Sequence, residues 1–311
     1  MRIIVVKRPT LLVPVAAVAA LLAGCGTGDS ESSGSDALEV AASFYPLEWA
    51  TEQVGGDHVE VTSLTPPGAE PHDLELTPKQ VAGLAEASLV VYASGFQPAV
   101  DDAVASVAAD AGFDVAPSAE LTIAATGEEE HGDEHDTAAM DPHFWLDPVR
   151  FEKVVTAIGD RLAAVDPANA ADYAAGAERL VGELETLDEE FAAGLADCRQ
   201  TTLVTSHTAF AYLAQRYGLD QVGISGVNPD VEPDAATLRR ISELVEAEGV
   251  TTIYTETLAS PALAETVARE TGATTAVLDP VAGLTDESAG TDYLEVMRSN
   301  LSTLETGQEC R

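Results

Sequence analysis

The chain has 311 residues, 46% hydrophobic and 22% charged, and its formal net charge is −38, with 53 acidic against 15 basic residues. This length and composition are typical of a globular protein with two domains and exclude a disordered chain. Nucleic-acid binding needs a basic face, so the charge argues against such a partner; we attribute it mainly to solubility, although it also suits the attraction of cations.

Residues 1–24 are predicted to form a signal peptide. Three basic residues lie among the first eight, and the apolar run at 11–22 is too short to span a bilayer comfortably. The following Leu22-Ala-Gly-Cys25 is typical of a bacterial lipoprotein processing site, which implies cleavage before Cys25 and a lipid on its sulfur. The alternative is an uncleaved anchor, but the small residues before Cys25 and the polar tract after it favour lipidation. With a flexible linker at 25–36, we expect an extracytoplasmic protein that a lipid anchors to the cell membrane.

Residues 37–147 are predicted to form an N-terminal α/β lobe. Apolar runs indicate strands at 38–44, 59–64, 88–93 and 113–116, and helix signals indicate helices at 47–54, 101–111 and from Thr77 onward. His72 lies in a proline-rich loop directly after the second strand. Open α/β sheets bind ligands at the carboxyl ends of their strands, so His72 is a candidate metal ligand. His58 is interpreted as a surface residue.

An acidic tract at 126–136, within this lobe, contains His131 and His135. Most such tracts are solvated loops, whereas histidines in them also capture metal loosely. Both interpretations, a flexible loop and an auxiliary metal-binding loop, stay open.

The segment Asp141-Pro-His-Phe-Trp-Leu-Asp-Pro148 contains a single histidine, His143. Each proline disfavours helix in the residue before it, so Asp141 and Asp147 are expected in extended or turn conformation. The three apolar residues after His143 would anchor the segment in a core. We therefore place His143 at the junction between two lobes, as a second candidate ligand.

Residues 148–197 are predicted to be linking helices. Apolar residues recur at helical spacing from Phe151 to Leu162, and Asp166-Pro167 then breaks the helix, with Asp166 as the N-cap of the next one. The Ala/Glu-rich stretch 168–195 predicts one helix about 42 Å long, which would act as a stiff connection between lobes.

Residues 198–311 are predicted to form a C-terminal α/β lobe on the same plan. Strands are expected at 202–205, 221–224, 251–255 and 275–278, with helices at 209–217, 237–248 and 261–271. His207, Glu256 and Asp279 each come just after one of these strands. Since strands that alternate with helices form parallel sheets, these side chains are expected at one edge of the sheet.

Two cysteines besides Cys25 remain in this part of the chain, Cys198 and Cys310. They form an even pair in the oxidising compartment of an exported protein. We predict a disulfide that ties the C-terminal tail to the start of the second lobe. The alternative is two buried thiols.

One shared metal site would explain why three of these residues follow strand ends and one lies in a proline-bounded motif: His72, His207, Asp279 and His143. Three imidazoles and one carboxylate suit Zn²⁺ better than Mn²⁺, although copper and nickel would also bind. Glu256 is predicted either to contact one of the metal-binding side chains without binding the metal itself, or to bind the metal in place of Asp279.

The same residues resemble the zinc- and manganese-binding lipoproteins that deliver metal to bacterial ABC importers. The resemblance covers nearly all of the chain after the signal peptide, and its motifs are Pro71-His72, Asp141–Pro148, Ser206-His207-Thr-Ala-Phe-Ala-Tyr-Leu, Tyr254-Thr-Glu256 and Leu278-Asp279-Pro280.

The resemblance implies two α/β lobes, each with a four-stranded parallel sheet flanked by helices, joined by one long helix. It also implies that the metal lies between the lobes on the positions of His72, His143, His207 and Asp279. Zinc-type members have histidine at the third position, as here, whereas many manganese-type members have glutamate. The implied partners are a membrane permease and its ATPase, and we expect a monomer.

Three other functions are considered. A manganese-binding protein of the same kind would prefer Mn²⁺ in a competition titration. A zinc-dependent hydrolase needs an open coordination position and usually a general base, and the sequence contains no His-Glu-x-x-His. A siderophore or haem receptor would need more aromatic or basic contacts than a chain with 5% aromatic residues offers. We therefore predict a binding protein and not an enzyme.

Overall fold

The protein is described from a computed structural model, which covers residues 37–125 and 139–311. The predicted signal peptide, Cys25 with its linker, and His131 and His135 lie outside the described residues. Within the described ranges, none of the helices combines the length and the apolar character that crossing a membrane requires.

The first sheet has four parallel strands in the order β2-β1-β3-β4. In chain order its elements are β1 (Leu38–Ala42), α1 (Tyr45–Gly55), β2 (Val59–Ser63), α2 (Pro78–Glu86), β3 (Leu89–Tyr92), α3 (Pro98–Val107), β4 (Gly112–Asp114) and α4 (Ala116–Ala119). The start of α2 follows directly from the sequence: Thr77 caps the helix through the backbone N–H of Gln80, and the Gln80 side chain returns a bond to Thr77.

Two long helices follow the first sheet: α5 (Pro148–Val165) and α6 (Ala170–Gly194). The helix α5 begins at Pro148 because the Asp147 side chain accepts from the next two backbone N–H groups. The predicted N-cap of the second helix is wrong. Asn169 occupies the N-cap position of α6, without a side-chain capping bond, since Asp166 precedes a short 3₁₀ helix and accepts from the Tyr173 hydroxyl at 2.8 Å instead.

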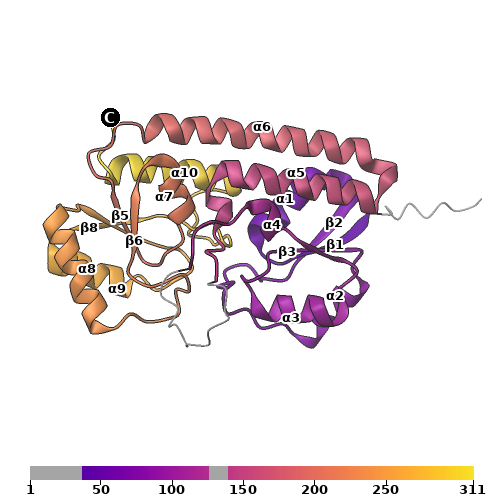
Figure 1. Ribbon diagram of the computed structural model, residues 1–311, viewed down its shortest axis with the longest axis horizontal. Coiled ribbons are helices and arrows are strands. Elements are labelled where there is room, and N and C mark those ends of the chain that lie inside the picture. Colours follow the sequence, from indigo (N-terminus) through magenta and orange to yellow (C-terminus); the bar gives the residue numbers. More distant parts are fainter. Residues whose placement is uncertain (1–36, 126–138) are drawn as a thin grey trace, which may run out of the picture. The chain divides into compact units, whose positions relative to one another are not determined.

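The second sheet has the same strand order, β6-β5-β7-β8, and is also parallel throughout. Its elements are β5 (Thr202–Thr205), α7 (Ala211–Tyr217), β6 (Asp220–Gly223), α8 (Ala235–Glu248), β7 (Thr252–Thr255), α9 (Ala262–Thr271), β8 (Thr274–Val277) and α10 (Tyr293–Gly307). The fold class predicted from the sequence is confirmed, with the lobes joined by α5 and α6 (Figure 1). The lobe boundaries after residues 147 and 197 stay a prediction, because one compact unit holds both sheets.

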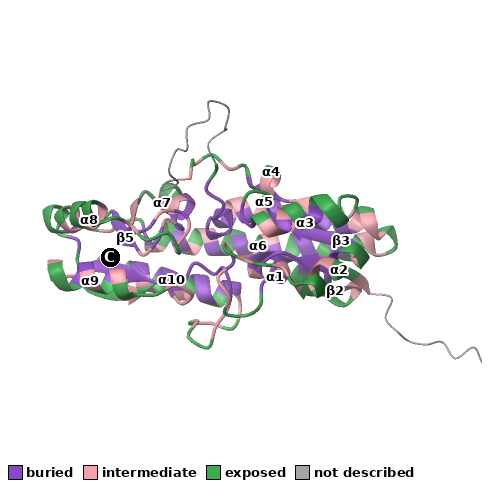
Figure 2. Cartoon of the chain, turned by 90° about the horizontal axis from the view of Figure 1, so that it is seen from below, coloured by how far each residue is buried: buried purple, intermediate pink, exposed green. Residues whose placement is uncertain are grey.

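The main core is continuous from one sheet to the other. It combines buried residues of both lobes with those of α1, α5, α6 and α10, and smaller clusters lie on the far side of each sheet. Figure 2 shows buried residues concentrated in the strands and along the inward sides of the helices. Trp145 belongs to this core and donates from Nε1 to the carbonyl of Pro280 at 2.8 Å. The motif around His143 is therefore fixed to the C-terminal lobe as well.

The predicted disulfide between Cys198 and Cys310 is confirmed, and it joins positions 112 residues apart. It connects the chain just after α6 with the residues that follow α10.

Candidate metal centre

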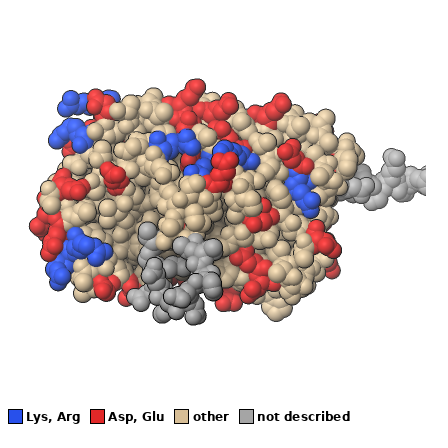
Figure 3. All heavy atoms as spheres, in the orientation of Figure 1, with Lys and Arg blue, Asp and Glu red and all other residues tan. Residues whose placement is uncertain are grey.

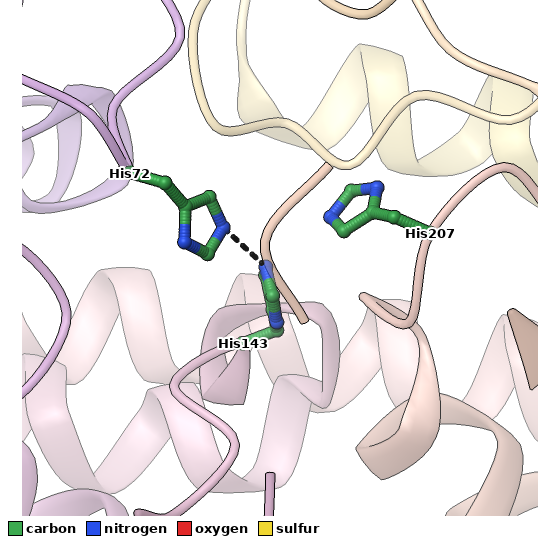
Figure 4. Close-up of side chains that lie close together, drawn as sticks. All are labelled: His72, His143 and His207. Atoms are coloured by element: carbon green, nitrogen blue, oxygen red, sulfur yellow. Dashed lines mark hydrogen bonds between the residues drawn. The ribbon is translucent and has the colours of Figure 1, made fainter. Parts of the chain in front are cut away.

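Three imidazoles from three separate segments converge between the lobes. His72 comes from the loop after β2, His143 from the turn before α5, and His207 from the loop after β5. One ring nitrogen of each can be chosen such that all three atoms lie within 4.8 Å of one another (Figure 4). It is the one such group found among residues 37–125 and 139–311.

His143 is held by the carboxylate two residues before it. Asp141 Oδ1 lies 2.9 Å from His143 Nδ1 and also accepts from the His143 backbone N–H at 2.9 Å. Both residues are buried. A carboxylate at Nδ1 fixes the proton there and leaves the Nε2 lone pair for a metal. That Nε2 lies 3.2 Å from Nε2 of His72. Burial lowers the pKa of His143, and Asp141 opposes this, so the ring is mainly neutral and ready to bind metal.

His207 is held in the same way from the other lobe. Its Nδ1 lies 2.6 Å from Glu256 Oε1, which also accepts from its backbone N–H at 3.2 Å. Glu256 follows β7, the neighbour of β5, and this is the point where the strand order of the sheet reverses. Burial alone would lower the pKa of His207, but the Glu256 carboxylate raises it above its usual value. Two roles were predicted for Glu256: contact with a ligand side chain, or binding of the metal itself. The bond to His207 supports the first.

His72 is more exposed than the other two histidines and lies in a loop. Its ring stands edge-on against Phe96, with centroids 4.7 Å apart, and its backbone N–H donates to Glu70 Oε1 at 3.1 Å. The buried Gln97 side chain donates to the carbonyl of Pro71 at 3.1 Å and so fixes the loop. Burial and the two neighbouring imidazoles lower the pKa of His72 to about 2. His72 is therefore neutral at physiological pH.

Asp279 does not belong to the three-histidine group, although its side chain is buried as well. Its Oδ1 accepts from the backbone N–H of Val281 at 2.8 Å, and its Oδ2 accepts from Ser288 at 3.0 Å and Thr257 at 3.1 Å. Burial raises its pKa. Thus the structure brings together three of the four predicted ligands, and the fourth has hydrogen bonds that a metal would have to replace.

Two residues of the centre were missed by sequence reasoning. Asp141 was noted only as part of the motif, although the spacing Asp-Pro-His returns the carboxylate to the ring of His143. Glu70 was not singled out; it sits against His72, and burial raises its pKa to about 7. The available signal for both was an acidic residue followed by proline and histidine, at 70–72 and at 141–143.

On the face drawn in Figure 3, acidic side chains are scattered over the surface and basic ones lie between them. This distribution agrees with solubility as the main reason for the net charge.

A family model described as "Zinc-uptake complex component A periplasmic" matches residues 40–307. The high-affinity zinc uptake system protein ZnuA of Bacillus subtilis is 37% identical over 96% of this chain and 97% of its own length. The zinc-binding lipoprotein AdcA of Streptococcus pneumoniae is 36% identical over 97% of this chain. This chain spans 62% of the length of AdcA.

Solved structures agree with these relatives. The Zn(II)-bound ZnuA-like domain of Streptococcus pneumoniae AdcA matches with a TM-score of 0.73 and 36% identity, over 88% of this chain and 99% of that one. A mutant of the laminin-binding adhesin of Streptococcus agalactiae matches with a TM-score of 0.78 and 31% identity, over 87% and 99% of the two chains.

Proposed function

Because the chain belongs to the family of zinc-uptake complex component A proteins, we propose that it captures Zn²⁺ outside the cytoplasm for import. Members of this family are solute-binding proteins and not enzymes. The observation that carries the proposal is the convergence of three imidazoles, two of which have Nδ1 on a buried carboxylate.

The proposed ligands are His72, His143, His207 and Asp279. Three neutral nitrogens and one carboxylate oxygen complete a closed four-coordinate set, which suits Zn²⁺ better than the oxygen-preferring Mn²⁺. To bind, the Asp279 carboxylate would exchange its hydroxyl partners, Thr257 and Ser288, for the ion. A manganese preference in a competition titration at neutral pH would contradict the zinc assignment.

Capture follows from the protonation of the centre. Zinc binds the deprotonated imidazole nitrogen, so it must displace any proton that His207 holds. The carboxylates of Asp141 and Glu256 would then bear part of the charge of the bound ion through the two rings. Two of the rings are already oriented before zinc arrives, which reduces the cost of ordering them.

Zinc would then pass to a membrane permease driven by its ATPase, which are the partners that work with proteins of this family. All four proposed ligands come from one chain, so we propose that it works as a monomer. Lipidation of Cys25 would keep it at the outer side of the cell membrane.

The experiment is a zinc titration of the purified protein against a chromophoric chelator, comparing the parent with His143→Ala. The variant should remain folded and lose more zinc affinity than the roughly 10–100-fold that is lost when a hydrogen-bonded partner of a ligand is removed. His58→Ala is the matched control, because His58 pairs with Asp172 on the surface at 3.0 Å. If His143→Ala binds zinc as tightly as His58→Ala, the three-histidine centre is not the zinc site.

A further inference from the structure

Tyr212 connects the two lobes at the metal centre, although nothing in the proposed capture uses it. It lies in the first turn of α7, five residues after His207, and its side chain is buried. Its hydroxyl donates to the carbonyl of Asp141 at 3.0 Å. The same oxygen accepts from the backbone N–H groups of Thr122 at 3.2 Å and Ile123 at 3.3 Å. A phenol has one proton and two lone pairs, so all of its hydrogen-bonding capacity is used.

The partners of this hydroxyl lie in two short stretches of chain that pair with each other just before His143. Asp141 donates from its backbone N–H to the carbonyl of Ile123 at 2.9 Å, and Ala124 pairs with Met140 in an antiparallel bridge. Residues 122–125 and 139–141 are thereby aligned side by side. Tyr212 closes the end of this pairing that lies nearest to His143.

The guanidinium of Arg150 packs over one face of the Tyr212 ring. Its guanidinium carbon lies 4.4 Å from the ring centroid, and its Nε pairs with Asp147 at 3.3 Å. The guanidinium also donates to the carbonyls of Ala119 and Glu120 and to the hydroxyl of Thr122. The ring is thus fixed between α5 and the paired residues 122–125 and 139–141, and its hydroxyl has little freedom to move.

We propose that Tyr212 is a positioning residue for the metal centre, which sets the separation of His143 and His207. The inference rests on the proposed zinc binding. The chain of contacts runs from His207 along the start of α7 to the Tyr212 hydroxyl, on to Asp141, and from its carboxylate to His143. Since one hydroxyl ties the segment that carries one ligand to the helix that follows another, its loss loosens their spacing.

The test compares Tyr212→Phe with Tyr217→Phe. Both remove one tyrosine hydroxyl from α7, but that of Tyr217 donates to Asp188 at 2.9 Å and has no contact with the centre. We expect Tyr212→Phe to lower zinc affinity by roughly 10–100-fold, the loss typical when a residue that orients a metal ligand is removed. We also expect it to speed zinc release. Tyr217→Phe should bind zinc as the parent does. Zinc binding of both variants is measured at a temperature well below their unfolding midpoints, so that loss of folded protein does not lower the measured affinity.

The visible spectrum of the Co²⁺-loaded protein is the second readout, because its bands report the coordination geometry and not the stability of the fold. Tyr212→Phe should shift or weaken these bands, and Tyr217→Phe should leave them unchanged. Parent-like affinity and spectrum in Tyr212→Phe would overturn the proposal, and so would equal losses in the two variants. A parent protein that does not bind zinc would instead refute the proposed function.

Discussion

Replacing Glu256 with glutamine tests how much the carboxylate behind a ligand contributes. In the folded protein Glu256 Oε1 accepts from Nδ1 and the backbone N–H of His207, at 2.6 and 3.2 Å. Glutamine keeps the shape and an acceptor oxygen but removes the charge. Loss of such a partner lowers metal affinity by 10–100-fold, which is about 1.4–2.7 kcal/mol at one decade per 1.36 kcal/mol.

The pH dependence gives this prediction its sign. Glu256 raises the pKa of His207, so in the parent a proton competes with zinc already at a higher pH. Without that charge the pKa of His207 falls, and proton competition begins only at lower pH. The advantage of the parent over Glu256→Gln should therefore shrink as the pH falls through the raised pKa of His207.

The same shift predicts a stability effect in the metal-free protein. A raised histidine pKa stabilises the folded state fully below the unfolded value of about 6.5, and the effect is lost as the pH rises through the folded value. Glu256→Gln should therefore reduce the gain in stability that protonation of His207 gives in the parent.

The assay is chelator competition at several pH values, with Glu248→Gln as the control. Glu248 accepts from Thr202 in the same lobe, without a histidine partner. Equal affinities of the parent and Glu256→Gln would refute the role of the carboxylate. A difference that grows as the pH falls would refute the link to the pKa of His207.

Three further predictions concern other parts of the chain. Asp279→Ala should lose more zinc affinity than Glu256→Gln, and parent-like titration would remove Asp279 from the ligand set. Reducing the Cys198–Cys310 disulfide should lower the free energy of unfolding by at most about 4–5 kcal/mol in the chain-entropy model. The two sulfurs contact the carbonyls of Leu195 and Leu304 and not the histidines, so chelator competition should give the same zinc affinity; a large loss would contradict this. Deleting residues 127–136 should leave the main site intact and lower the total zinc bound, whereas an unchanged stoichiometry by elemental analysis would exclude an auxiliary role for His131 and His135.

The strands and most helices could be predicted because their signals are local. Short strands such as β3 (LVVY) and β5 (TLVT) consist of apolar, aromatic and β-branched residues, nearly all of them buried. Glycines such as Gly218 and Gly249 end helices in the left-handed conformation that favours glycine. The last helix, α10, was missed although Tyr293, Met297, Leu301 and Leu304 repeat at helical spacing and Asp292 caps it. Here the signal was present and was not used.

The candidate ligands could be found from position alone, since His72 and His207 follow strand ends and His143 has its own motif. The side-chain partners could not. Whether Asp141 points to His143 or to solvent depends on the turn that Pro142 makes, and Glu256 reaches His207 only because β5 and β7 are neighbours. Sequence order does not reveal which strands pair, so contacts between side chains at adjacent strand ends require the fold.

Each lobe contributes to the centre a histidine that is held in the same manner, and this arrangement favours capture over catalysis. From each side comes one imidazole whose Nδ1 is fixed by a buried carboxylate, Asp141 for His143 and Glu256 for His207. Nε2 of His72 lies 3.2 Å from Nε2 of His143 at the same centre. Ligands supplied from both lobes enclose an ion from opposite sides, whereas a hydrolytic zinc needs an open position for water. Release then requires the lobes to separate or a ligand to leave, and the Tyr212 hydroxyl acts against the first of these.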